Sequence, residues 1–120
     1  MVHGTPPARR VVSELADDEV IGPLLPEFTR ELVARAVEID AAARRRDRRA
    51  LRELCHRLCG TSALFGFPAL SAASGAVEAL LVSRRADDAS LTAAVAQVVE
   101  EARAIDLGRG AEALVLSAAG

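Results

Sequence analysis

The chain has 120 residues, a formal net charge of −2 and three phenylalanines as its only aromatic residues. This is the length of a single domain, and the near-neutral charge excludes the strongly basic field that is typical of nucleic-acid-binding proteins. No apolar run reaches the ~18 residues that a membrane-spanning helix needs, so we expect neither nucleic acid nor a membrane as a partner. No signal peptide precedes the two cysteines, which predicts a reduced, cytoplasmic protein.

The start of the chain has no periodic pattern. Residues 1–12 combine glycine, proline and arginine and predict a disordered lead, in which His3 has no expected role. Ser13 is a typical helix-capping residue, and an acidic cluster from Asp17 to Glu19 follows it. These features favour a short extra N-terminal helix or helical turn.

Four amphipathic helices are predicted next, because apolar residues recur at three- and four-residue spacing. Asp47 caps the second helix, and either Asp87 or Asp88 caps the fourth. The predicted helices cover residues 22–46, 47–65, 68–86 and 89–106. Similar lengths and short connections favour an all-α fold, an antiparallel four-helix bundle with up-down-up-down topology over residues 13–106. The apolar pattern is weak in residues 107–120. We expect a tail there with three alternatives: it frays, it packs back on the bundle, or it leads into a segment that is removed.

The second helix separates a buried stripe from a face that carries a histidine. With about 100° per residue, one side of this helix is apolar or small. The stripe consists of Leu51, Leu54, Cys55, Leu58, Ser62 and Phe65. His56 falls about 140° from Leu51, off the stripe. Its neighbours on that face are Arg45, Arg49 and Arg52 before it, and Cys59, Gly60 and Ala63 after it.

Gly60 is the unusual residue of this face. A glycine inside a helix costs about 1 kcal/mol relative to alanine, and an ordinary solvated face has no reason to accept that cost. A bare backbone next to His56 would let a loop of another protein reach the imidazole, and arginines around the ring would stabilise an anion on it. Access and positive charge together favour a phosphorylatable histidine over a merely solvated one.

The stretch "HRLCGTSALFG" resembles the signature of histidine-containing phosphotransfer (HPt) domains. That signature has histidine, any residue, leucine, lysine, glycine, serine or a similar residue, and a later glycine. The matching residues here are His56, Leu58, Gly60, Thr61 and Gly66. The resemblance implies a monomeric four-helix bundle that carries a phosphoryl group on His56 between a sensor kinase or receiver aspartate and another receiver domain. It also implies a phosphocarrier that is not itself an enzyme and has no nucleotide site or cofactor, since the Mg²⁺ used in transfer is held by the receiver.

One position departs from the family pattern. Cys59 stands where the family has lysine, and a thiol cannot stabilise a phosphoryl dianion. Arg52, one turn before the histidine, or Arg57 beside it would compensate, with Arg52 better aimed. The alternative is a degenerate HPt-like module that binds a receiver or a hybrid histidine kinase without carrying phosphate.

Partner contacts are expected around the histidine. The candidates are Arg49, Cys59, Gly60, Ala63 and Leu64, with Phe67 as either a contact or a core residue. The arginine run of residues 44–49 is commonly a solvated segment, but beside a phosphotransfer site it would form a positive rim that steers the acidic pocket of a receiver.

Other chemistries fit the same residues less well. "CHRLC" offers three metal-ligand side chains on one helix, whereas a closed zinc site has four ligands, usually from two segments, so we expect no metal. A Cys55–Cys59 disulfide would require the two side chains to meet, but the helical spacing places Cys55 on the buried stripe and Cys59 on the face of His56. Hydrolytic catalysis lacks an acidic residue placed within the helix to orient His56, and nothing indicates an oxyanion hole.

Overall fold

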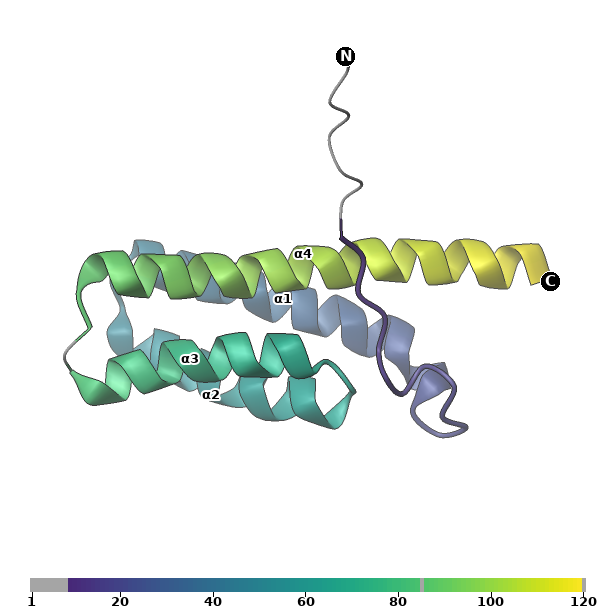
Figure 1. The fold of residues 1–120 in the computed structure, drawn as a ribbon, viewed down its shortest axis with the longest axis horizontal. Coiled ribbons are helices and arrows are strands. Elements are labelled where there is room, and N and C mark those ends of the chain that lie inside the picture. The colour runs from purple at the N-terminus through teal and green to yellow at the C-terminus, as the bar shows by residue number, and fades with distance from the viewer. Residues whose placement is uncertain (1–8, 85, 120) are drawn as a thin grey trace, which may run out of the picture.

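The computed structural model describes residues 9–84 and 86–119, with side chains for 9–84 and 86–108. Within these residues the chain forms four α-helices and one 3-10 turn, η1 (Gly22–Leu24). The helices are α1 (Leu25–Arg44), α2 (Arg48–Leu64), α3 (Pro68–Ser83) and α4 (Asp88–Ala119). Successive helices run antiparallel and pack side by side, which confirms the predicted all-α four-helix bundle (Figure 1).

The helix boundaries follow from capping residues and prolines. The side chain of Asp47 accepts a hydrogen bond from the backbone N–H of Ala50, so it caps α2 as predicted. Asp87 accepts from the backbone N–H of Ser90 at the start of α4, and this hydrogen bond holds the pKa of Asp87 below its usual value. That cap is therefore lost only in acid, as the carboxylate takes up a proton. Pro68 lies in the first turn of α3, where its missing N–H is no loss.

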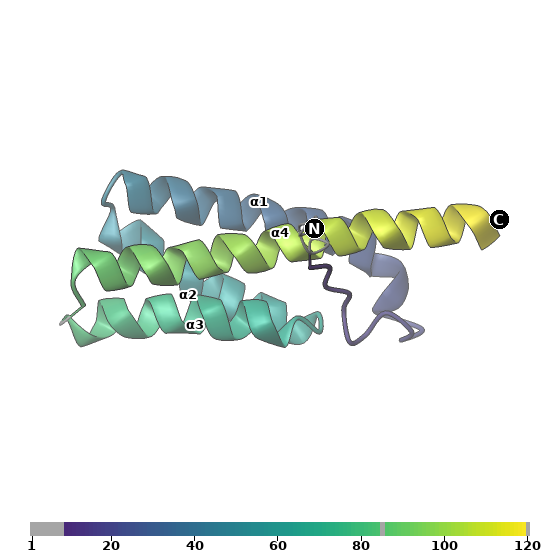
Figure 2. The same cartoon turned by 45° about the horizontal axis from the view of Figure 1, so that its top comes forward.

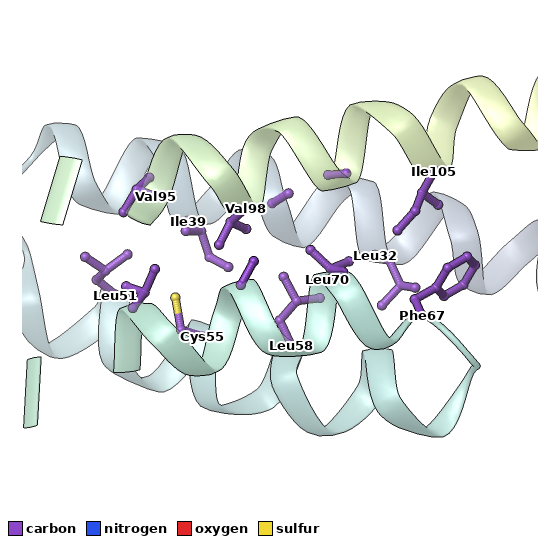
Figure 3. Close-up of a cluster of buried hydrophobic side chains, with 14 of the residues drawn as sticks. Leu32, Ile39, Leu51, Cys55, Leu58, Phe67, Leu70, Val95, Val98 and Ile105 are labelled. Atoms are coloured by element: carbon purple, nitrogen blue, oxygen red, sulfur yellow. The ribbon is translucent and has the colours of Figure 1, made fainter. Parts of the chain in front are cut away.

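The apolar stripes of the four helices meet in one core (Figure 3). Ile39, Leu51, Val77 and Val98 come from the four different helices, and each is at most 1% exposed. The predicted stripe of α2 is confirmed, with Leu54 half-buried at its edge. Phe67, which the sequence left open between core and partner contact, belongs to the core and is 3% exposed.

The fourth helix is longer than predicted. We expected it to end at Asp106, but α4 continues to Ala119 and runs past the α2–α3 turn (Figure 1). Alanine, leucine and glutamate in this part of the chain are strong helix formers, and no proline interrupts them. Gly108 and Gly110 lower helix stability without ending the helix. The side chains beyond residue 108 lie outside those described.

The segment before α1 also differs from the prediction. His3 and residues 1–8 lie outside the described residues, but residues 9–12, expected in the disordered lead, lie against α4, where the backbone N–H of Val11 donates to the carbonyl of Ala104 (2.9 Å). Ser13 caps no helix, since residues 14–17 form turns only. The short extra helix is the single 3-10 turn η1, directly before α1.

The connections divide the bundle into two ends. The α1–α2 and α3–α4 connections lie at one end, and the α2–α3 turn lies at the other, near the N-terminal segment (Figures 1 and 2). Within the described residues, no helix is both long enough and apolar enough to cross a membrane.

Candidate functional site

His56 projects from the middle of α2, and its side chain is 76% exposed. The helical spacing therefore predicted the position of the imidazole correctly, away from the core residues Cys55 and Leu58 on either side. One ring nitrogen is not free. Nδ1 of His56 lies 2.7 Å from Oε2 of Glu78, a residue of α3 whose side chain is 27% exposed.

The contact with Glu78 determines which nitrogen of the His56 ring carries the proton. A carboxylate can only accept, so Nδ1 carries the proton, and in the neutral imidazole the lone pair is then on Nε2. Glu78 also holds the orientation of the ring and would stabilise a positive charge that develops on it. The site thus leaves Nε2, with its lone pair, as the open nitrogen of an exposed and oriented ring.

Sequence reasoning did not find Glu78. The sequence interpretation considered acidic residues within the same helix only, whereas this one comes from the neighbouring helix. The available signal was its position directly after Val77, a fully buried residue of α3, which places Glu78 at the edge of the α2–α3 interface.

Arginines surround His56 on the α3 side. Arg49, Arg52, Glu53, His56 and Glu78 line a hollow of about 460 Å³ between α2 and α3. Nε of Arg49 lies 3.6 Å from Glu53, so part of its charge is compensated. No carboxylate of the described residues forms an ion pair with Arg52. Arg52 is therefore the uncompensated cation of the hollow that His56 and Glu78 share.

A second, more apolar groove lies on the α1 side of His56. We call it the α1/α2 groove; it has a volume of about 590 Å³. It is lined by Phe28, Glu31, Leu32, Arg35, His56, Arg57, Leu58, Gly60, Thr61 and Leu64. Leu64 is 65% exposed although it is a large apolar side chain. Arg57 belongs to this groove, so Arg52 and Arg57 lie on opposite sides of the histidine, and the exposed Ala63 lines neither hollow.

Gly60 has no reason within the chain to be a glycine. A Cβ built on it would meet no atom within 4 Å, and its backbone is that of a regular helix. The mid-helix Gly75 of α3 differs, because a Cβ there would lie 3.4 Å from Sγ of Cys59. The open space above Gly60 lies on the face of His56, so the helix backbone is bare in the groove beside the imidazole.

Cys59 turns toward α3 at the edge of this face. Its Sγ lies 3.5 Å from Oγ of Ser71, and the Ser71 hydroxyl donates to the Cys59 carbonyl (2.8 Å). The cysteine thus fills a narrow contact between α2 and α3 and contributes no charge to the site.

The two cysteines differ in exposure, since Cys55 is buried and Cys59 is half-buried. Both thiols are free. Burial raises the pKa of Cys55 to about 12, with the nearby charge of Glu78 adding to the effect, so this thiol stays protonated. In residues 9–84 and 86–108, no three His, Cys, Asp or Glu side chains gather as metal ligands would.

The fold and the site together define a class of protein: a four-helix bundle with one exposed histidine that a carboxylate of the neighbouring helix holds in position. A family model described as "Hpt domain" matches residues 23–106, which is well over half of the chain. The chain therefore belongs to the Hpt domain family, the histidine phosphotransfer modules of two-component signalling. Such domains are phosphocarriers that interact with receiver domains and kinases in phosphorelays. Neither the curated proteins nor the solved structures gave a match to this chain.

Proposed function

We propose that His56 carries a phosphoryl group between a sensor kinase or receiver aspartate and another receiver domain. The observation that carries this proposal is the 2.7 Å contact between Nδ1 of His56 and Glu78, which leaves Nε2 as the open nitrogen on an exposed face. The alternative is a degenerate module that binds a receiver or kinase and carries no phosphate, and the cysteine at position 59 is the feature in its favour.

The transfer step follows from the protonation of the ring. The Nε2 lone pair attacks the phosphorus of an aspartyl phosphate, the P–Nε2 bond forms, and the bond from phosphorus to the aspartate oxygen breaks. The aspartate leaves as a carboxylate with its electron pair, and the ring becomes cationic because Nδ1 keeps its proton. Glu78 stabilises that cation, and a second receiver aspartate reverses the step. In this proposal Mg²⁺ and the remaining phosphate ligands belong to the receiver, and the chain uses no cofactor of its own.

Arg52 is the residue we propose to stabilise the phosphoryl group in place of the lysine of the family. It shares the hollow of His56 and Glu78, and its charge is not compensated by a carboxylate of the described residues. Arg57 points to the other groove and is the weaker candidate. Arg49, Gly60, Ala63 and Leu64 remain proposed partner contacts, as does Cys59 at the edge of the face.

Replacing Arg52 tests this assignment. We expect Arg52→Ala to slow phosphoryl transfer about 10- to 100-fold, the effect of losing one charge-assisted hydrogen bond, while Arg57→Ala changes the rate little. Cys59→Lys in the Arg52→Ala background should restore part of the rate, because a lysine stem can lie along α3 with its ammonium group at the rim. Rates are measured by rapid-quench transfer from a phosphorylated receiver. Equal losses in the two arginine variants, or no rescue by lysine, would contradict the role given to Arg52.

The two sides of His56 suggest how a receiver docks. The α1/α2 groove offers the apolar surface of Phe28 and Leu64. In the arginine run of residues 44–49, three arginines form ion pairs, while Arg45 and Arg46 form none with the described residues and supply positive charge at the end of the bundle where α2 begins. We propose that this charge steers the acidic pocket of a receiver toward His56 and that the groove holds it there.

The function is tested by transfer of label. The purified protein is mixed with receiver domains that carry ³²P on aspartate, and acid-labile label is then sought on this chain. Arrival of that label supports the carrier function. Binding of a receiver without transfer of label would favour the degenerate module, and an absence of both binding and transfer across a broad set of receivers and kinases would count against both.

A further inference from the structure

We propose that residues 9–21, the N-terminal strap, position the end of the α1/α2 groove for a receiver, with Ser13 as the main positioning residue. This inference rests on the proposed function and adds a part of the chain that lies outside the matched residues 23–106. The strap contacts α4 and the α2–α3 turn, and a third contact connects that turn to the groove.

The first contacts hold the strap to α4. Nη2 of Arg9 donates to Oε1 of Glu101 (2.7 Å), and Glu101 is only 4% exposed. The N–H of Val11 donates to the carbonyl of Ala104, inside a helix that would ordinarily use that carbonyl itself. Gly108 lets the strap come this close, since a Cβ there would overlap the carbonyl oxygen of Val11. The side chain of Glu101 and the glycine at position 108 therefore fit the path of the strap along α4.

The second contacts hold the strap to the turn that ends the site helix. The buried hydroxyl of Ser13 donates to the carbonyl of Phe65 (2.5 Å) and accepts from the N–H of Leu15 (3.0 Å). The N–H of Glu14 donates to the carbonyl of Gly66 (2.9 Å). Gly66 has φ of 82°, and a Cβ on it would lie 2.6 Å from Oγ of Ser13. Both the left-handed backbone and the strap therefore require glycine at position 66.

The third contact connects this turn to the groove. The ring of Phe65 stacks on that of Phe28, with ring centroids 3.7 Å apart and planes inclined by 25°. Phe28 lines the groove together with Leu64, the last residue of α2, and His56 lies in the same groove two turns earlier. A hydrogen bond to the Phe65 carbonyl thus holds both the exposed Leu64 and the Phe28–Phe65 stack. His56 itself is held separately, by Glu78.

The strap holds the end of the groove, whereas Glu78 holds His56. A positioning role of the strap can therefore be distinguished from general stabilisation. If the strap only stabilised the bundle, any substitution that lowers stability should affect docking and chemistry in the same way as loss of the strap. If it positions the groove, its loss should weaken receiver docking and leave the chemistry at His56 intact, because no strap contact reaches the imidazole or Glu78.

Ser13→Ala tests the inference through two different phosphodonors. We expect the receiver concentration that half-saturates transfer to rise about 5- to 20-fold, while the rate at saturating receiver stays within about twofold. Phosphorylation by phosphoramidate, a small donor that needs no groove, should be unchanged. The matched control is Val95→Ala, which removes apolar contacts from the core but touches neither the strap nor the groove. It should lower stability and leave the half-saturating concentration unchanged.

Amide hydrogen exchange of the protein alone supplies a readout that does not depend on phosphate. Ser13→Ala should speed exchange at Leu64–Phe67 more than in the middle of α2, and Val95→Ala should not. Equal half-saturating concentrations in wild type and Ser13→Ala, or a parallel rise in Val95→Ala, would overturn the positioning role. If the wild-type protein takes no label from any receiver, the proposed function fails and the receiver part of this inference fails with it. Unchanged exchange at Leu64–Phe67 in Ser13→Ala would refute the strap contact independently.

Discussion

His56→Gln is expected to abolish phosphoryl transfer and to leave the bundle folded. The side chain is 76% exposed and lies off the buried stripe, so its replacement removes no core contact. Glutamine can still donate to Glu78, but its amide has no lone pair comparable to that of Nε2 and cannot form the phosphorylated intermediate. Label transfer from a phosphorylated receiver should fall to background, while the circular dichroism spectrum and the urea midpoint should match those of the wild type.

Glu78→Gln is the matched variant on the other side of the same contact. It keeps an acceptor oxygen for Nδ1 but removes the negative charge that stabilises the cationic ring, so transfer should slow about 10- to 100-fold without being lost.

Residual label in His56→Gln would mean that another residue accepts the phosphoryl group. A large loss of helicity in that variant would instead show that His56 is structural.

Much of the bundle could be predicted because each helix carries its own signal. The stripe from Leu51 to Phe65 defines the buried side of α2 without reference to any other helix. The same helical spacing predicts that His56 lies outside the core. Asp47 and Pro68 mark helix starts by local hydrogen bonding and local geometry. Properties that depend on one helix at a time were therefore accessible from the sequence.

The parts that were missed depend on how segments meet. The Glu78 contact requires the rotation of α3 about its axis relative to α2, which the pattern of α3 alone does not determine. The strap contacts its neighbours through backbone groups and a few isolated side chains, such as Arg9, Val11 and Ser13, so its sequence carries no periodic signal. The length of α4 was missed because the apolar stripe weakens after Asp106 while helix propensity persists.

The helical glycines whose surroundings the structure describes differ in whether another part of the chain approaches them. Gly75 and Gly108 stand where another part of the chain approaches closely, namely Cys59 and Val11. Gly60 faces open space and yet lies in the groove beside His56. Packing within the described residues does not account for a glycine at this position, whereas the proposed docking of a receiver does.

Gly60→Leu is therefore expected to block the partner and spare the fold. A leucine at this position projects into the groove that His56 and Leu64 share, and its bulk would hold a docking surface away from the imidazole. Transfer from a phosphorylated receiver should fall about 100-fold or more, since a small misplacement of the reacting atoms has effects of that size. Phosphorylation of His56 by phosphoramidate should persist, because a small donor needs no such access.

Gly60→Ala separates access from helix stability. Its methyl group meets no atom of the chain, so the variant should be about 1 kcal/mol more stable than the wild type in urea unfolding, by helix propensity alone. Its transfer rate should fall between those of the wild type and Gly60→Leu. Gly75→Ala is the control, since its methyl faces Cys59 rather than the groove and should leave transfer unchanged. If Gly60→Leu received label from a receiver at the wild-type rate, the bare backbone would have no role in docking, and the glycine would be a loss of stability without a function.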